Sequence, residues 1–403
     1  MNPFTTSKIA TNEILSIVNV GSYKVRTVIC SFSFGWVKIL GYWEKRQSRL
    51  DIINNEINNV AWVCDTIGQS ILKAEVEAWV QPKKIIINPF LSNTFYYSKK
   101  IHYKQQDNEK IIDKKQLCQI ISSVEKQSLS SSYRDITSKF GIEKQDLQII
   151  LTNISQIKID GENTDSLIWK TAEDIKIEIS NMLISKTNYK LIQDISNFLW
   201  KKVLKIIPEE YALTTIWAKE KKVVFLNIWN SSTFISITWN NNLKGSIRLD
   251  VWIQDLLKPI AKNTSKNRSE IIKKLDRSDL FRDEKEHFLS FFTDILTSGL
   301  KELLANNICP HHFVLSWGWA NNIFIQEHIA QIDFAKYSIK MLKKVDFITA
   351  SIKQIKKISW VEDILSISNI NLIAQIVATS QMLSRKKDPI EQALKKCLKD
   401  LNS

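Results

Sequence analysis

Glycine is scarce in this sequence, with nine residues among 403, or about 2% where about 7% is usual. The five cysteines form no CxxC pair, which argues against a disulfide framework and indicates reduced, cytosolic thiols. The sequence has no signal peptide and no run of about 18 apolar residues, so we expect no membrane-spanning helix. The adjacent His311 and His312 have no cysteine or aspartate close by in the sequence, and we expect no metal site there.

Tryptophan, in contrast, is abundant, with 13 residues. Several stand where glycine is typical, in turns and at the ends of helices and strands: Trp43, Trp79, Trp169, Trp239 and Trp252. The chain is rich in Ile, Lys and Asn, as an A/T-rich genome produces, and that bias should deplete the tryptophan codon UGG. Some bacteria read UGA as glycine, whereas another variant code reads it as tryptophan. We therefore predict that the cell reads these codons as glycine; the alternative is a tryptophan-rich interaction surface.

The net charge of +14 favours an anionic partner, either a lipid surface or a nucleic acid. Because no localised nucleic-acid motif is present, we expect no nucleic-acid partner. A chain of 403 residues also suggests two or more domains.

A unit of three strands, a helix and a further strand occurs twice. In the first copy we expect strands at 14–20, 24–30 and 37–41, a helix at 59–78 and a strand at 84–87. In the second copy we expect strands at 222–228, 233–238 and 243–249, a helix at 251–262 and a strand at 312–316. The repetition indicates an internal duplication in an α/β protein.

The segment between the copies, about 88–200, has a different character. It begins with a polar, Ser-rich stretch around QSLSSSY, the weakest pattern in the chain. Strands at 147–151 and 174–179 and a helix at 188–199 follow, and KVLKII at 202–207 returns to the first unit. This predicts a small inserted α/β domain.

Three turns have the residues of an anion-binding loop: Val20-Gly21-Ser22-Tyr23-Lys24, Ile228-Trp229-Asn230-Ser231-Ser232-Thr233 and Ser316-Trp317-Gly318-Trp319-Ala320. With glycine at the tryptophan positions, backbone N–H groups in these loops could approach phosphate oxygens closely. The turns resemble the two phosphate motifs and the adenosine motif of actin-like ATPases, whose duplicated ribonuclease-H-like domains hold nucleotide in the cleft between them. The resemblance implies ATP as cofactor and a nucleotide site formed by Gly21, Ser22, Lys24, Asn227, Trp229, Asn230, Ser231, Ser232, Thr233, Ser316, Trp317, Gly318 and Trp319.

Within that superfamily the chain most resembles FtsA, which tethers the FtsZ ring to the membrane in bacterial cell division. The segments that carry the resemblance are VKILGYWEKRQ, INNVAWVCDTIGQSILKAEVEAWVQPKKIIIN, KIDGENTDSLIWKTAEDIKIEISNMLISKTNY and IIPEEYALTTI, and the similarity covers roughly residues 12–383. It implies subdomain 1A at 12–88 plus 200–220, an inserted FtsA-type (SHS2) subdomain 1C at 89–199, subdomain 2A at 221–254 plus 309–383, a reduced subdomain 2B at 255–308 and a basic amphipathic helix at 384–403.

The sequence departs from the family at two positions that bear on chemistry. The carboxylates of the first and second phosphate motifs are replaced by Asn19 and Asn227. Carboxylates would hold Mg²⁺ and position the attacking water, and a neutral amide does neither well. We therefore expect ATP binding with little or no hydrolysis, and no catalytic or metal-ligating residue. Glu270 and Lys273, on a helix resembling the family's adenosine-side helix, are further nucleotide-binding candidates or else a solvated surface pair.

At the C-terminus, apolar residues at helical spacing alternate with lysines: Ile390, Leu394, Leu398 and Leu401 with Lys395 and Lys396. This pattern predicts an interfacial helix that attaches the protein peripherally to the anionic inner face of the cytoplasmic membrane. The alternative is a surface helix packed on its own domain. The shortness of subdomain 2B, where the family docks FtsZ through a strand-rich extension, puts that contact in doubt.

The resemblance thus implies a cell-division scaffold of the septum, part of the divisome, that polymerises and links FtsZ and other division proteins to the membrane. A PilM-like adaptor of pilus assembly shares the fold and the insert and stays open as an alternative. An active ATPase or sugar kinase is a further alternative, although the sequence offers no convincing catalytic aspartate.

Overall fold

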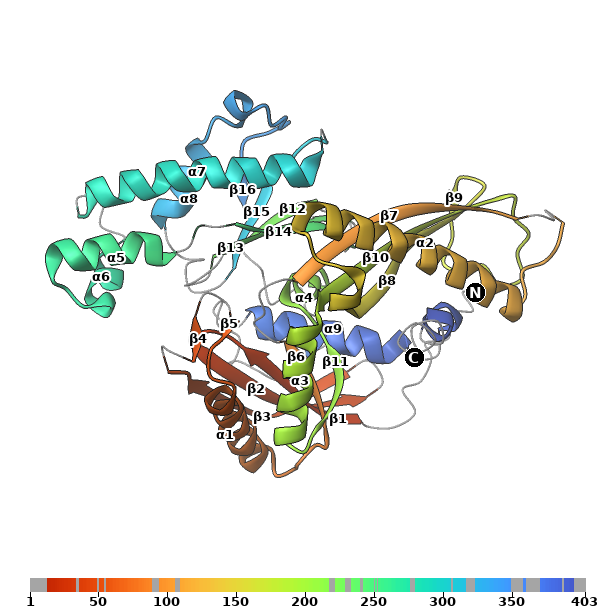
Figure 1. Ribbon diagram of the computed structural model, residues 1–403, viewed down its shortest axis with the longest axis horizontal. Helices are drawn as coiled ribbons and strands as arrows, with labels where there is room; N and C mark the ends of the chain where they lie inside the picture. The colour runs from red at the N-terminus through yellow and green to blue at the C-terminus, as the bar shows by residue number, and fades with distance from the viewer. Residues whose placement is uncertain are drawn as a thin grey trace.

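The computed structural model describes residues 13–33, 36–48, 51–53, 56–88, 94–105, 109–216, 222–228, 233–239, 242–249, 251, 253–275, 280–305, 307–316, 323–348, 358–359, 370–385 and 388–394. Its strands form a six-stranded sheet, a five-stranded sheet and a separate four-stranded sheet. Figure 1 shows the first sheet below, the second sheet above and the four-stranded sheet to the right.

The first sheet has the order β11-β6-β1-β2-β3-β17. Strands β1 (Glu13–Val20), β2 (Lys24–Ser33) and β3 (Trp36–Arg46) form an antiparallel meander. Strand β6 (Lys84–Asn88) pairs parallel with β1, and β11 (Lys202–Ile206) pairs parallel with β6. The short strand β17 (Ile358–Ser359) extends the other edge, and β4 (Ile52–Ile53) and β5 (Glu56–Ile57) form a small hairpin apart from the sheet.

The second sheet repeats this topology in the order β14-β13-β12-β15-β16. Its antiparallel meander consists of β12 (Val223–Ile228), β13 (Thr233–Trp239) and β14 (Asn242–Leu249). Strands β15 (His312–Ser316) and β16 (Asp346–Phe347) follow in parallel, as β6 and β11 do in the first sheet. The predicted internal duplication is therefore confirmed, strand by strand and with the same directions.

Helices separate and cover the two sheets. Helices α1 (Val60–Ala78) and α3 (Lys186–Phe198) pack on the outer face of the first sheet. Between the sheets, apolar side chains of α4 (Glu209–Thr214) and α9 (Ile370–Ser384) contact strands of both. The outer face of the second sheet is covered by α5 (Ile253–Thr264), α6 (Arg268–Lys274), α7 (Arg282–Leu304) and α8 (Ile323–Gln331), with a short η2 (Phe334–Tyr337) beyond.

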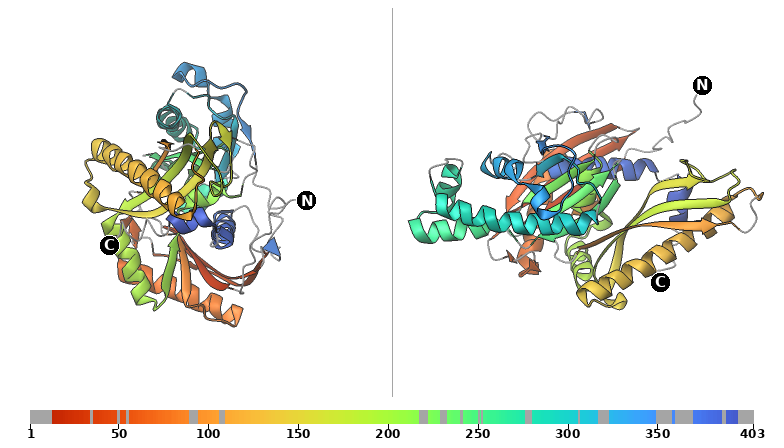
Figure 2. Two further views of the ribbon diagram at one scale, coloured as in Figure 1. Left: turned by 90° about the vertical axis from the view of Figure 1, so that its right-hand side faces the viewer. Right: turned by 90° about the horizontal axis from the view of Figure 1, so that it is seen from above.

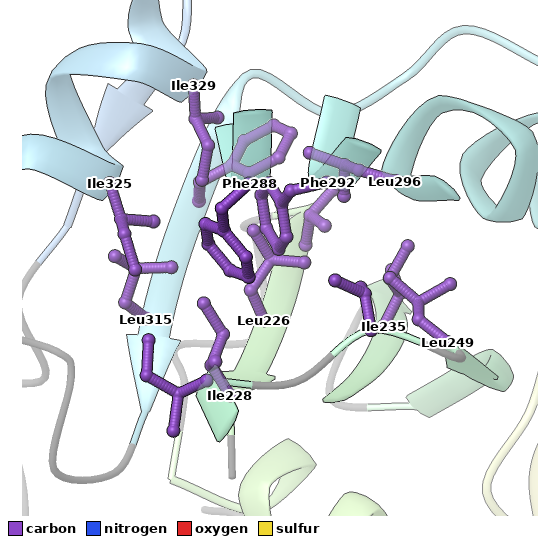
Figure 3. Close-up of a cluster of buried hydrophobic side chains, with 14 of the residues drawn as sticks. Leu226, Ile228, Ile235, Leu249, Phe288, Phe292, Leu296, Leu315, Ile325 and Ile329 are labelled. Carbon is purple, nitrogen blue, oxygen red and sulfur yellow. The ribbon is translucent and has the colours of Figure 1, made fainter. Parts of the chain in front are cut away.

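The core of the second half fixes the strand ends that bear on function. Figure 3 shows Phe288 and Phe292 of α7 pointing towards Leu226 of β12. Leu226 and Leu315 belong to one buried cluster, and each directly precedes a polar residue at the end of its strand, Asn227 and Ser316. Packing of these apolar neighbours therefore holds the two strand ends in place.

The segment between the halves forms its own sheet, with the order β7-β10-β8-β9. The strands are β7 (Thr94–Lys104), β8 (Leu147–Ile159), β9 (Glu162–Asn163) and β10 (Asp174–Ser185). Helix α2 (Lys114–Phe140) packs against this sheet, and the short 3-10 helix η1 (Lys144–Asp146) connects α2 to β8. We call this segment, residues 94–185, the insert. The Ser-rich stretch, whose sequence pattern is the weakest in the chain, lies inside α2. Its Ser128 and Ser132 face the sheet, and Asn181 donates a hydrogen bond of 2.8 Å to Ser128.

The insert contacts the second half as well as the first (Figure 2). Lys139 of α2 pairs with Glu302 of α7 at 3.0 Å, and Lys244 of β14 pairs with Glu178 of β10. The hydroxyl of Tyr96 donates to the backbone oxygen of Leu243. A rotation of one half against the other would therefore move or break contacts of the insert.

The C-terminal residues differ from the expected lipid-facing helix. Residues 389–394 are helical, and Leu394 is only 2% exposed because it packs into the core of the insert, where Ile390 also lies. Leu398, Leu401, Lys395 and Lys396 lie outside the described residues. No helix in the described ranges is long and apolar enough to cross a membrane.

Every tryptophan in the described ranges is exposed, by 43% to 95%: Trp36, Trp43, Trp62, Trp79, Trp169, Trp200 and Trp239. Tryptophan is highly buried on average, so this distribution is unusual. Trp79, Trp169 and Trp200 also have positive φ, at 54°, 65° and 53°. Trp43 lies within β3 and not in the expected turn, and Trp239 ends β13. Trp252, Trp317 and Trp319 lie outside the described residues.

Two of these tryptophans terminate helices as glycine does elsewhere in the chain. Trp79 follows α1, and its backbone N–H donates to the carbonyl oxygens of Glu75 and Val76. Gly141 closes α2 in the same left-handed conformation, at φ 67°. Glycine is the usual residue at this position because it has no Cβ to oppose a positive φ. The backbone thus supports glycine at Trp79 and at Trp200, which follows α3.

Candidate functional site

The carboxyl ends of the parallel strands bring three amides together. Asn19 at the end of β1 is the register partner of Asn88 at the end of β6. Asn227 occupies the corresponding place near the end of β12, beside Ser316 of β15. In α/β sheets, ligands bind beyond the carboxyl ends of strands. All three asparagines are buried.

Glu209, the first residue of α4, joins this group. The side-chain amide of Asn227 donates a hydrogen bond of 2.7 Å to its carboxyl oxygen Oε1. Burial, and next the charge of Glu210, raise the pKa of Glu209 well above its usual range. Hydrogen bonds from Asn227 and Asn88 and the charge of Arg26 oppose that shift. Glu209 therefore favours its neutral, protonated form in the folded protein.

Several buried polar atoms in the same region have no hydrogen-bond partner. Both side-chain atoms of Asn19, which is 1% exposed, lack one, as do Oδ1 of Asn227 and Oγ1 of Thr233. Buried polar groups are normally satisfied, so an unsatisfied set indicates a place for a ligand or ordered water. These atoms come from the two halves of the duplicated fold, where the sequence predicts the two phosphate motifs.

Cations border the group on the first half. Arg26 lies opposite Asn19 in the β1–β2 pairing, and its Nε is 3.5 Å from Oε2 of Glu44. Lys24 pairs with Oε1 of the same carboxylate. Gln47 holds the turn between β1 and β2, because its side-chain nitrogen donates a hydrogen bond of 2.6 Å to the carbonyl oxygen of Gly21.

The predicted site residues divide into three sets. Six lie at or next to the ends of β1, β2, β12, β13 and β15: Gly21, Ser22, Lys24, Asn227, Thr233 and Ser316. Trp229, Asn230, Ser231, Ser232, Trp317, Gly318 and Trp319 lie outside the described residues. Glu270 lies in the first turn of α6, where its carboxylate accepts a hydrogen bond of 2.6 Å from the side chain of Asn267. Lys273 lies in the last turn of that helix.

Three residues of the group were not predicted from the sequence: Arg26, Asn88 and Glu209. The parallel pairing of β1 with β6 and of β6 with β11 places Asn88 beside Asn19 and starts α4 at the same edge. A usable signal was the position of Asn88 and Glu209 at or just after the ends of predicted strands.

Replacing Glu209 by glutamine should flatten the pH dependence of stability. Since its pKa is raised on folding, stabilisation by Glu209 is complete below the pKa of the unfolded chain and is lost as the pH rises towards the folded pKa. Glutamine keeps an acceptor for Asn227 without a proton to lose. As the pH rises above the usual pKa of a glutamate, the free energy of unfolding of the unmodified protein should fall relative to Glu209→Gln, by at most about 1.4 kcal/mol per pH unit. Urea unfolding at several pH values measures this, and parallel pH profiles would contradict it.

Comparison with known proteins identifies similar folds but no family to which the chain belongs. No protein-family model and no curated protein matches the chain. The chain superposes on PilM in the PilM-PilN type IV pilus biogenesis complex with a TM-score of 0.60 and 10% identity, covering 93% of this chain and 98% of PilM. The ethanolamine utilization protein EutJ from Carboxydothermus hydrogenoformans matches with a TM-score of 0.42 and 9% identity, over 84% of this chain and 85% of EutJ.

A protein of unknown function from Bacteroides thetaiotaomicron, described as having an actin-like ATPase fold, matches with a TM-score of 0.36 and 9% identity. The match spans 89% of this chain and 98% of the Bacteroides protein. The repeated strand order and the similarity to PilM give the fold class as α/β: the chain has the actin-like ATPase fold of two duplicated halves with an inserted domain.

Proposed function

We propose that this protein is an actin-like adaptor that binds ATP without hydrolysing it and holds a partner protein. The main support is the buried hydrogen bond between Asn227, near the end of β12, and Glu209, the first residue of α4. Two carboxylates at this separation would repel each other unless a cation or proton lay between them. An amide at position 227 removes that requirement, and with it a ligand for the metal that orients phosphate and water.

The insert supplies a surface for a partner protein. A groove of about 690 Å³ runs beside β8, between the insert and helices α4 and α9, with Gln156, Tyr211 and Arg385 among its lining residues. Strand β8 pairs with β10 along one edge, but in the described ranges only Lys158 and Ile159 pair on the other edge, with β9. An extended peptide could add to such an edge through backbone hydrogen bonds.

Pilus assembly is the partner context that the comparison favours. The chain covers nearly all of PilM, which is found in complex with PilN. Between α5 and α7 the described residues include helix α6 and no strand. This is the region where the resemblance to FtsA implies a strand-rich extension that docks FtsZ. We therefore place a PilM-like role first, and an FtsA-like role with FtsZ, self-assembly and other division proteins second.

Membrane attachment through the C-terminal helix competes with the packing of that helix on the insert. Leu394 is buried against the insert, and burying a leucine contributes roughly 2 kcal/mol. A lipid surface would have to replace that contact before the helix could lie on it. Peripheral attachment to an anionic membrane would therefore require undocking of residues 389–394.

Binding of ATP can be tested on the protein with glycine at its 13 tryptophan positions, which we call the glycine form. At one hundred times its Kd, ATP should raise the free energy of unfolding by about 2.7 kcal/mol. The protein with tryptophan at these positions should bind more weakly, because bulky side chains at positions 229, 317 and 319 would hinder close approach of phosphate. Calorimetric titration and urea unfolding provide the measurement.

An absence of ATP binding by the glycine form would contradict the proposal. Co-sedimentation with FtsZ filaments separates the two partner contexts. The PilM-like role predicts that the protein stays in the supernatant. Sedimentation with FtsZ would instead favour the role in cell division.

A further inference from the structure

The actin-like fold implies Mg²⁺ beside the nucleotide, and the residues of this cleft do not suit that ion. Mg²⁺ is usually held through one or two carboxylates together with phosphate oxygens and water. Positions 19 and 227 carry amides, and the remaining carboxyl group, Glu209, already accepts a hydrogen bond from Asn227. Among the described residues, no three His, Cys, Asp or Glu side chains stand close enough together to hold a metal ion.

Positive charge in the cleft comes from the protein itself. Arg26 is 6% exposed and lies opposite Asn19 across the β1–β2 pair. Arg26 and Lys24 both pair with the carboxylate of Glu44, so two cations lie beside one carboxylate at this edge of the sheet. A guanidinium matches phosphate oxygens in geometry and stays charged at any physiological pH.

The amides also change how the site interacts with phosphate, from repulsion by a carboxylate to hydrogen bonding by an amide N–H. A carboxylate at position 19 would repel a phosphate oxygen directly and bind it only through a bridging cation. The amide nitrogen of Asn19 is a buried donor without a partner and can donate to such an oxygen itself. The same exchange at position 227 removes a second negative charge from the second phosphate motif.

We infer that the cleft binds its nucleoside triphosphate without a divalent metal, with Arg26 in the role of the counter-charge and Asn19 as a phosphate donor. This inference rests on the proposed nucleotide-binding function. A metal-free triphosphate is more negative than its Mg²⁺ complex, so Arg26 attracts it more strongly. The cleft therefore selects free ATP over MgATP, which would also deprive the bound nucleotide of the ion that hydrolysis requires.

The test is a titration of the glycine form with ATP in two buffers, one containing EDTA and one containing excess Mg²⁺. We expect binding in EDTA to be at least as tight as in Mg²⁺. Arg26→Ala should weaken binding in EDTA by about 10- to 100-fold, whereas Arg26→Lys keeps the charge and should lose less. Urea unfolding of each variant separates lost binding from lost folding.

A matched variant, Asn19→Asp with Asn227→Asp, restores both carboxylates. It should reverse the preference, binding ATP in Mg²⁺ and losing it in EDTA. Tight binding by the glycine form only in Mg²⁺ would overturn the inference and leave the proposed function intact. An absence of binding in both buffers would overturn the proposed function itself, and equal binding by Arg26→Ala in EDTA would remove Arg26 from the account.

Discussion

Replacing Trp79, Trp169 and Trp200 together by glycine should raise the free energy of unfolding by about 3 kcal/mol, or about 1 kcal/mol at each position. All three residues adopt positive φ, where a Cβ atom crowds the backbone and glycine is not strained. Their side chains are exposed, so the substitution removes little packing. Most substitutions of tryptophan destabilise a protein, which makes the predicted sign distinctive. Urea unfolding of the two proteins measures the difference.

Trp62 provides the matched control. It is also exposed, by 61%, but lies in the first turns of α1, where the backbone is right-handed. Trp62→Gly should give no gain and should cost up to about 1 kcal/mol, as glycine does inside helices. A gain at Trp62 as large as at Trp79 would show that loss of exposed apolar surface, and not backbone conformation, causes the effect. Peptide mass spectrometry of the native protein identifies the residue directly, and tryptophan at these sites would refute the glycine interpretation.

The two repeated units could be predicted because their strands are continuous apolar runs bounded by turns. Strands β12, β13 and β15 begin and end within a residue of the expected positions. Helix α9 was not predicted because it is buried between the two sheets, so that its residues are mostly apolar and its polar Asn371, Gln375 and Thr379 are buried as well. Helix α2 was obscured because two of its buried residues, Ser128 and Ser132, are polar. Asn181 of the sheet donates a hydrogen bond to Ser128, and the hydroxyl of Ser132 donates to the backbone oxygen of Ser128.

The candidate site was predictable only where residues are adjacent in the sequence. Asn19 and Asn227 stand beside phosphate-type turns and could be recognised from their motifs. Arg26, Asn88 and Glu209 come from three other segments and meet only through the parallel pairing of β1, β6 and β11. Their interaction, and the raised pKa that burial gives Glu209, depend on tertiary structure and have no local signal.

The second large effect concerns the fate of bound ATP, which we expect to remain intact. Phosphoryl transfer requires a metal to neutralise developing charge and a group that orients the attacking water. Loss of one preorganised group of this kind typically lowers a rate about 10²- to 10³-fold, and here both carboxylate positions carry amides. The raised pKa of Glu209 also reduces the fraction of this group that is charged and able to accept a proton from water.

The most direct measurement uses the glycine form in molar excess over ATP labelled at the γ-phosphate, in buffer containing Mg²⁺. Bound nucleotide is separated after prolonged incubation and resolved into ATP, ADP and phosphate. The account predicts that the label stays in ATP, with release of phosphate no faster than in buffer alone. Rapid release of labelled phosphate that is abolished by Thr233→Val or Lys24→Ala would contradict it and identify the protein as an active ATPase.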